Sequence, residues 1–208
     1  FSTHEAVDAV SFTGSSAVGD TVGRQANETG KRVQLEMGGK NPTVVMPSAD
    51  VDEAVDIAVS GAFGVTGQAC TATSRAIVHE DVYDEFVEGA VAAADAVEIG
   101  PGLDGAEMGP QVSEGELDST LEYVDIGVGE GATLETGGDE VAAGDGFFIK
   151  PAVFSNVDPT MRIAQEEIFG PVLAIIPVSG YEEAVEVAND VRYGLSASIV
   201  SGQIGRAV

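Results

Sequence analysis

Apolar residues along the chain follow two spacings, one typical of strands and one typical of helices. Short β-rich runs predict strands at residues 7–12, 32–35, 43–46, 74–79, 172–178 and 195–200. Apolar positions three and four residues apart predict helices at residues 16–28, 50–62, 82–97, 114–124 and 181–191. Strands that alternate with helices in this way predict an α/β fold with a largely parallel sheet and flanking helices.

Polar and glycine residues mark where these elements begin and end. Ser113 and Glu116 have the spacing of a capping box, which predicts a helix start at this point. Ser15 or Ser16 is a candidate N-cap for the helix at residues 16–28, and Gly30 is expected to follow its end. The glycines at residues 137–146 predict a looser, turn-rich stretch.

Charge is the most unusual feature of the composition. The 208 residues include 35 acidic and 9 basic ones, for a net charge of −26, yet 44% are hydrophobic, which is enough for a core. With only three lysines and no basic patch, binding to nucleic acid or to an anionic membrane surface is not expected. The apolar run at 172–176 is too short to span a bilayer, and residues 1–5 lack a signal-peptide pattern. We therefore expect a cytoplasmic protein.

The acidic residues are dispersed along amphipathic elements and are not gathered in a tail. Molar salt shortens the Debye length to about 3 Å, so neighbouring carboxylates would barely repel each other there. We therefore hypothesise a halophilic source. The alternative is an ordinary acidic protein from a low-salt organism.

Cys70 is the single cysteine, so no internal disulfide is possible, which suits a reducing cytoplasm. It lies in a segment of small residues, where Gly67 and Ala69 leave room for a ligand to approach. The thiol is either a nucleophile or a small buried hydrophobe.

Glu36 follows a predicted strand and stands between Leu35 and Met37. An apolar setting raises the pKa of a carboxyl group and prepares it to act as a general base near neutral pH. The alternative is a strand-end glutamate that faces water.

Residues 14–21 nearly match a phosphate-binding loop, but Asp20 replaces the lysine and would repel a triphosphate. This strand-to-helix turn can still offer backbone N–H groups to a pyrophosphate, or it is a plain capped helix start.

His4 and His79 have no metal-ligand spacing to Cys70 or to each other, so no metal site is expected, and no local signature supports a Cys/His hydrolase.

Five segments resemble motifs of the aldehyde dehydrogenase superfamily and occur in its order. Residues 12–15 resemble the coenzyme loop, and residues 35–42 resemble the general-base motif. Residues 67–70 resemble the nucleophile motif, and residues 166–172 resemble the coenzyme-ribose motif. Residues 193–197 resemble a strand start near the C-terminal third. The resemblance extends over nearly the whole chain.

The resemblance implies a role for each matching residue. Cys70 would attack the aldehyde carbon, Glu36 would activate the water that hydrolyses the resulting thioester, and the Cys70 backbone N–H would donate to the oxyanion. The cofactor would be NAD or NADP. The coenzyme-binding residues would be Glu167 at the nicotinamide ribose, Phe169 near the ring, and Gly14, Ser15 and Val18 at the coenzyme loop.

The resemblance also implies how the chain is organised. Residues 1–35 correspond to the C-terminal part of a coenzyme-binding domain and residues 36–208 to a catalytic domain truncated at its C-terminal end. We therefore expect a fragment that alone binds coenzyme poorly and is inactive. The full-length enzyme is expected to be a homodimer or homotetramer.

The general-base and nucleophile segments resemble, within this superfamily, the branch that oxidises 2,5-dioxopentanoate (α-ketoglutarate semialdehyde). Such a substrate needs a cation for its carboxylate, and Arg75 and Arg162 are the candidates, although a structural role for Arg75 is equally open. The rival hypotheses are a coenzyme-A-acylating enzyme and a non-catalytic protein that keeps the fold.

Overall fold

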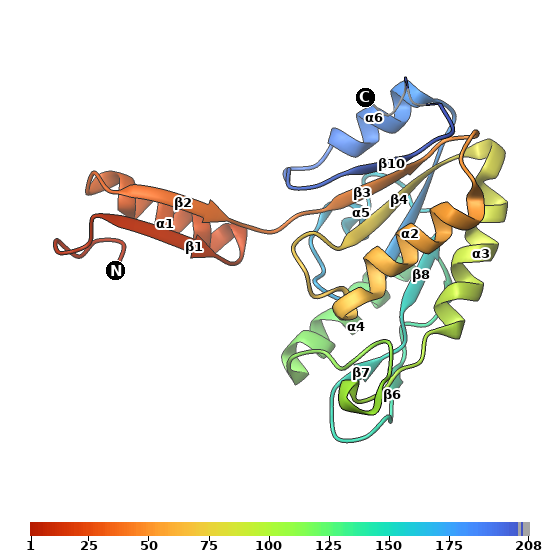
Figure 1. Cartoon of the computed structure of the whole chain (residues 1–208), viewed down its shortest axis with the longest axis horizontal. Helices are drawn as coiled ribbons and strands as arrows, with labels where there is room; N and C mark the ends of the chain where they lie inside the picture. Colours follow the sequence, from red (N-terminus) through yellow and green to blue (C-terminus); the bar gives the residue numbers. More distant parts are fainter. Residues whose placement is uncertain (204, 206–208) are drawn as a thin grey trace. The chain divides into compact units, whose positions relative to one another are not determined.

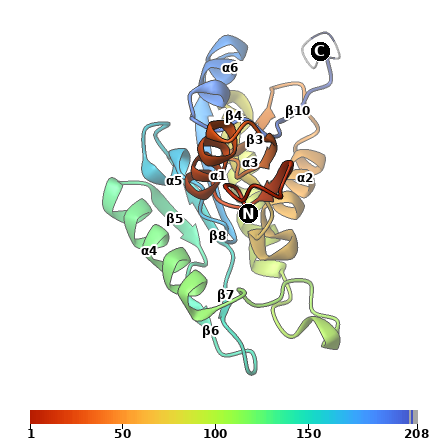
Figure 2. The same ribbon diagram turned by 90° about the vertical axis from the view of Figure 1, so that its left-hand side faces the viewer.

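The structure is a computed structural model that describes residues 1–203 and 205. The chain forms two compact units, Phe1–Gly39 and Lys40–Val208, which we describe separately. Figures 1 and 2 show the elements of both units. Among the described residues, no helix is both long and apolar enough to cross a membrane.

The first unit is a strand–helix–strand motif. Strands β1 (Ala9–Thr13) and β2 (Arg32–Glu36) pair in parallel, with Ala9 opposite Arg32. Helix α1 (Ser16–Glu28) connects them and buries small residues, which let the helix approach the strands closely. Ser15 is the N-cap residue by backbone conformation, but its side chain makes no capping hydrogen bond. The expected helix range is confirmed, including its end before Gly30, whose φ is +69°.

The second unit is built on a six-stranded sheet with the order β10-β3-β4-β9-β8-β5. Every neighbouring pair is parallel except β5 and β8. A separate antiparallel pair, β6 and β7, occupies the stretch expected to be rich in turns. The bounds of the strands are β3 Asn41–Val45, β4 Thr73–His79, β5 Thr133–Thr136, β6 Glu140–Val141, β7 Phe148–Ile149, β8 Ala152–Ser155, β9 Val172–Val178 and β10 Ser198–Val200.

Helices cover both faces of this sheet, as Figures 1 and 2 show. One core cluster joins the sheet to α2 (Val51–Phe63) and α3 (Tyr83–Ala96). The other joins it to α4 (Glu114–Glu130), α5 (Arg162–Gln165) and α6 (Tyr181–Asn189). Short 3₁₀ turns include η1 Gly64–Gly67, η2 Glu80–Val82 and η3 Gly102–Asp104.

The central strands contribute to both cores because successive side chains point to opposite faces. On β9, Leu173 and Ile175 belong to one cluster, whereas Ala174 and Ile176 belong to the other. A strand buried on both sides is nearly continuously apolar, which explains the run at residues 172–176. The expected α/β fold with a mostly parallel sheet and flanking helices is confirmed.

Candidate functional site

Cys70 lies on the surface, just after the turn that ends α2. It is a free thiol and is exposed. Its location excludes the alternative in which Cys70 is a small buried core residue. The thiol is therefore accessible to a small molecule.

The turn before Cys70 has an unusual backbone. Val65, Thr66 and Gly67 have φ values of 54°, 59° and 67°, in the left-handed region that costs non-glycine residues free energy. A Cβ atom on Gly67 would lie 2.3 Å from the Gly170 carbonyl oxygen, so only glycine fits. The turn thereby brings the cysteine segment against the segment that follows Glu167.

Side-chain hydrogen bonds hold this turn to the loop at residues 109–112. Thr66 Oγ1 donates to the Gly109 carbonyl oxygen at 3.0 Å. Gln68 Nε2 donates to the Pro110 carbonyl oxygen at 3.2 Å, and its Oε1 accepts from Val112 N–H at 2.8 Å. Gln68 thus uses both ends of its amide to fix the backbone two residues before the thiol.

Asn41 fixes the other side of the cysteine segment, and the sequence did not single out this function. Its Nδ2 donates to the carbonyl oxygens of Cys70 at 2.8 Å and Ala72 at 2.9 Å. Its Oδ1 accepts from Ser196 N–H at 3.1 Å. The amide is 5% exposed, so these bonds are largely shielded from water and rigidify the loop.

The segment expected to bind the ribose lies beside the cysteine turn. Glu167 is half-buried, and Phe169 is 39% exposed with a φ of 59°. Glu166 is held by Arg162, whose Nε and Nη2 donate to its oxygens at 3.0 and 2.9 Å, and by the Tyr123 hydroxyl at 2.7 Å. The hydrogen bonds from Arg162 lower the pKa of Glu166, and burial together with Glu166 raises the pKa of Tyr123 to about 12.

Neither arginine proposed for a substrate carboxylate is well placed for that role. Arg75 is 1% exposed, and its three nitrogens donate to the backbone carbonyls of Lys40, Val187 and Ala188 at 2.9–3.0 Å. Arg75 therefore joins strands and a helix end, the structural alternative. Arg162 is bound bidentately to Glu166.

Glu36 ends β2 in the first unit, and its side chain is exposed. The apolar setting expected from its neighbours is not found, because alternation along the strand turns Leu35 inward and Glu36 outward. Gln34 Nε2 donates to Glu36 Oε1 at 3.3 Å, and the Glu36 carbonyl oxygen accepts from Gly14 N–H at 3.0 Å. The backbone of the general-base candidate is thus hydrogen-bonded to Gly14 of the coenzyme-loop candidate.

Gly14, Ser15 and Val18 all lie on the surface around the N-terminal end of α1. The Ser15 side chain does not cap this helix, so the first-turn N–H groups are available to an anion. A helix N-terminus that follows a strand and a turn in this way offers backbone N–H donors of the kind that bind phosphate groups.

His79 is not placed to form a hydrolase dyad with Cys70 in the second unit. Cys70 comes three residues before the start of β4 and His79 is the last residue of that strand, so the length of the strand, roughly 20 Å, separates them. His79 Nδ1 accepts from Asp81 N–H at 3.2 Å. Within the part of the chain that the structure describes, no group of three or more His, Cys, Asp or Glu side chains is arranged to hold a metal ion.

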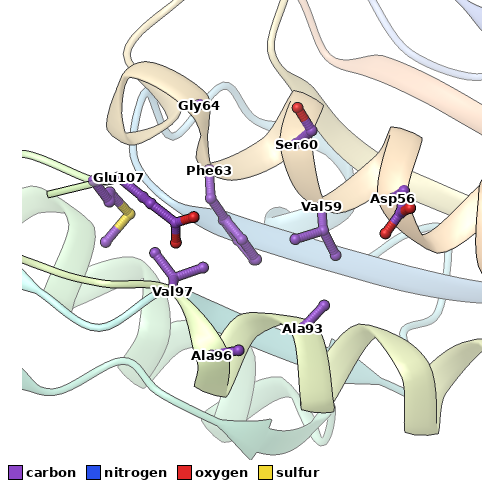
Figure 3. A pocket seen from close by; sticks show the side chains of 10 residues that line it. Asp56, Val59, Ser60, Phe63, Gly64, Ala93, Ala96, Val97 and Glu107 are labelled. Atoms are coloured by element: carbon purple, nitrogen blue, oxygen red, sulfur yellow. The ribbon is translucent and has the colours of Figure 1, made fainter. Parts of the chain in front are cut away.

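A hollow of about 500 Å³ lies between α2 and α3, and Figure 3 shows Phe63, Val59, Ala93 and Val97 around it. Asp56 and Glu107 also line it. None of the candidate site residues does, so this hollow is separate from the chemistry expected at Cys70.

Relatives of known name match nearly the whole chain. It is 61% identical over 201 residues to the α-ketoglutarate semialdehyde dehydrogenase of Haloferax volcanii, covering 95% of this chain and 42% of that protein. It is 42% identical over 200 residues to the 2,5-dioxopentanoate dehydrogenase of Saccharolobus solfataricus, again covering 95% and 42%. The chain thus spans less than half the length of these relatives.

Solved structures agree with the sequence relatives. The betaine aldehyde dehydrogenase of Staphylococcus aureus in complex with NAD+ superposes with a TM-score of 0.96 at 38% identity, covering 99% of this chain and 42% of that one. An NAD-dependent aldehyde dehydrogenase from Sinorhizobium meliloti gives the same TM-score at 39% identity, covering 99% and 41%. The profile of the aldehyde dehydrogenase family matches residues 1–208, and the chain belongs to this family.

Proposed function

We propose that this chain is the catalytic part of a longer enzyme that oxidises an aldehyde to a carboxylate with NAD or NADP. The observation that carries the proposal is the exposed thiol of Cys70, which follows a turn whose Gly67 packs against the Gly170 carbonyl oxygen. Gly170 comes three residues after Glu167 in the sequence. Residues 1–35 would end the coenzyme-binding domain, and residues 36–208 would form most of the catalytic domain.

The first chemical step belongs to Cys70. Its thiolate attacks the aldehyde carbon, and the backbone N–H of Cys70 donates to the oxyanion of the thiohemiacetal. The bound nicotinamide coenzyme would supply the hydride acceptor that oxidation of this adduct to a thioester requires. The hydrogen bonds from Asn41 to the segment after the thiol hold the reacting sulfur in one position.

Glu36 completes the reaction as the general base. It removes a proton from water, which attacks the thioester carbonyl and releases the carboxylate and the Cys70 thiolate. Gly14, Ser15 and Val18 would line the coenzyme loop, Glu167 would accept hydrogen bonds from the nicotinamide ribose, and Phe169 would pack near the ring.

The substrate that we propose is 2,5-dioxopentanoate. Support comes from the names of relatives, including an α-ketoglutaric semialdehyde dehydrogenase of Bacillus subtilis that is 47% identical over 207 residues. Because Arg75 and Arg162 are engaged within the chain, we assign recognition of the substrate carboxylate to other groups.

We further propose that the enzyme works in the cytoplasm of a halophile as a homodimer or homotetramer. The excess of 35 acidic over 9 basic residues supports the salt adaptation. Sedimentation of the full-length enzyme at about 3 M salt tests both solubility and assembly, and a monodisperse monomer would contradict the assembly.

The test of function uses the full-length enzyme, an aldehyde panel, both coenzymes and high salt. We expect 2,5-dioxopentanoate to give the highest kcat/KM and the Cys70→Ala variant to lose turnover. Release of a coenzyme A thioester in place of a carboxylate would indicate the acylating reaction. Full activity of Cys70→Ala would contradict the proposed chemistry.

A further inference from the structure

Gln111 is a buried polar residue in the loop at residues 109–112. The other residues of this loop bind the turn before Cys70 through their backbone groups. The Gln111 side chain binds helix α4 instead, because its Nε2 donates to Thr120 Oγ1 at 3.0 Å. Gln111 is 1% exposed, and Thr120 is fully buried. The loop thus contacts the nucleophile turn with its backbone and α4 with this side chain.

Stability does not account for a glutamine at this position. The Oε1 atom of Gln111 is buried and has no hydrogen-bond partner among the described residues. A buried acceptor without a partner destabilises the folded state, and an apolar side chain of similar length would avoid that cost. The hydrogen bond to Thr120 is directional, however, so it holds the two side chains in one arrangement where apolar contacts would allow several.

The Gln111–Thr120 pair packs against Gly170. A Cβ atom at Gly170 would overlap with Thr120 Oγ1 and would lie 2.9 Å from Gln111 Nε2. The carbonyl oxygen of Gly170 is also the atom that leaves no room for a Cβ at Gly67. The Gly170 backbone is therefore in close contact both with the turn before Cys70 and with the Gln111–Thr120 pair.

Phe169, the residue before Gly170, has a strained backbone. Its φ of 59° lies in the left-handed region, which is costly for a bulky residue and persists only where the surroundings hold it. The chain is fixed again just after Gly170, because Ala152 N–H donates to the Pro171 carbonyl oxygen at 2.8 Å. The Phe169 side chain is partly exposed, so the support of its backbone determines where the ring lies.

We propose that Gln111, together with Thr120, is a positioning residue that sets the distance between the Cys70 adduct and the nicotinamide ring. This inference rests on the proposed function, in which Phe169 packs near that ring. The oxyanion adduct loses one hydride to the oxidised coenzyme and becomes the thioester, which requires a short distance and aligned atoms. By holding Gly170, the pair keeps Phe169 in a fixed place relative to the turn before Cys70.

The test follows coenzyme reduction in a single turnover of the full-length enzyme, with saturating coenzyme and less 2,5-dioxopentanoate than enzyme. Gln111→Met keeps the length of the side chain and removes the unpaired acceptor. We expect its Tm to equal or exceed the native value, whereas its single-turnover rate should fall about tenfold. Deuterium on the aldehyde carbon should slow the reaction in the native enzyme and in the variant, because hydride transfer is the step observed.

Substitutions at Thr120 test the same pair from its other member. Thr120→Val removes the hydroxyl and should slow the single turnover, whereas Thr120→Ser keeps the hydroxyl and should stay near the native rate. Combining Thr120→Val with Gln111→Met should add little, because each substitution breaks the same hydrogen bond. Ser155→Ala is the matched control, since it removes a buried hydroxyl that binds Glu135, and it should react at the native rate.

A native single-turnover rate in both Gln111→Met and Thr120→Val would overturn the inference, and a lowered Tm at that rate would show a packing role alone. A slow rate that returns to the native value at higher coenzyme concentration would indicate weaker binding, which also contradicts positioning. Loss of the isotope effect in the variants would mean that another step had slowed, with the same consequence. If the native enzyme forms no reduced coenzyme, or the Cys70→Ala variant still does, the proposed function fails and this inference fails with it.

Discussion

Asn41 and Cys70 are joined across 29 positions of sequence by a hydrogen bond of 2.8 Å, from the amide Nδ2 to the cysteine carbonyl oxygen. The same Nδ2 reaches the Ala72 carbonyl oxygen, and the Oδ1 reaches Ser196 N–H. One largely buried side chain thus fixes the loop of the proposed nucleophile to the first strand of the large sheet.

Replacing Asn41 by alanine should loosen this loop. Three partly buried hydrogen bonds are lost and their backbone groups are left without this partner, so we expect a loss of about 1–3 kcal/mol in the free energy of unfolding. In the full-length enzyme, kcat should fall at least about tenfold. Asn189→Ala removes an exposed asparagine whose amide donates to the Val185 carbonyl oxygen of its own helix, and it should have little effect on either quantity. Equal effects of the two variants would contradict a special role for Asn41.

Gly67→Ala should be strongly destabilising. The added methyl group would lie 2.3 Å from the Gly170 carbonyl oxygen, and the φ of +67° is unfavourable for alanine. We expect a loss of about 2–4 kcal/mol by urea unfolding. Gly64→Ala, at the other end of the same turn, is the matched control, because its Cβ would meet no atom within 4 Å and its φ is −53°. A Gly67→Ala protein as stable as Gly64→Ala would refute the tight packing of this turn.

Lys40 predicts how stability changes with pH. Burial, and then the charge of Arg75, lower the pKa of Lys40 from its ordinary 10.5 to about 7 in the folded chain. Between these values the unfolded state binds more protons, so this group makes stability increase as the pH rises from about 7 to about 10. Below about pH 7 the amine is charged in both states, and its burial costs at most about 5 kcal/mol.

Comparing the native protein with the Lys40→Met variant separates the contribution of the Lys40 amine to the pH dependence of stability from that of its charged neighbours. These neighbours are Arg75, Glu167 and Glu166. The variant should be more stable than the native chain at about pH 6, and the difference should shrink towards about pH 10. Urea titrations at several pH values measure it. A pH-independent difference between the two proteins would show that Lys40 has an ordinary pKa.

Salt should stabilise the folded chain. At most nine of the 35 acidic residues can be neutralised by the basic side chains, so the remainder repel one another at low ionic strength. We expect a clearly higher Tm at about 3 M than at about 0.1 M salt, because the Debye length falls from about 10 Å to about 3 Å or less. The same Tm at both concentrations would contradict the halophilic hypothesis.

Most elements of the fold could be predicted from the spacing of apolar residues. Helix α1 matches its expected range, and the capping role expected of Ser113 is present, since its Oγ accepts from Glu116 N–H at 3.3 Å. Strands β5 and β8 and the β6–β7 pair were missed, because they have four residues or fewer and no clear apolar alternation. The four-residue helix α5 was missed for the same reason.

The candidate site was only partly predictable. Cys70 and Glu36 stand out because their residue types and neighbours suggest chemistry within one short segment. Asn41 acts through contacts with residues 29 and 155 positions away in sequence, so no local pattern indicates its role. The guanidinium of Arg75 is bound to carbonyls 112 and 113 residues away, which only the folded chain reveals.

The most direct test of the proposed function is to trap the thioester. The full-length Glu36→Gln variant is mixed with 2,5-dioxopentanoate and excess NAD+ or NADP+, and its mass and peptide map are determined. We predict one acyl group per chain, attached to Cys70, formed together with one equivalent of reduced coenzyme and released slowly. Steady turnover at the native rate without such an adduct, or an adduct at another residue, would contradict the account.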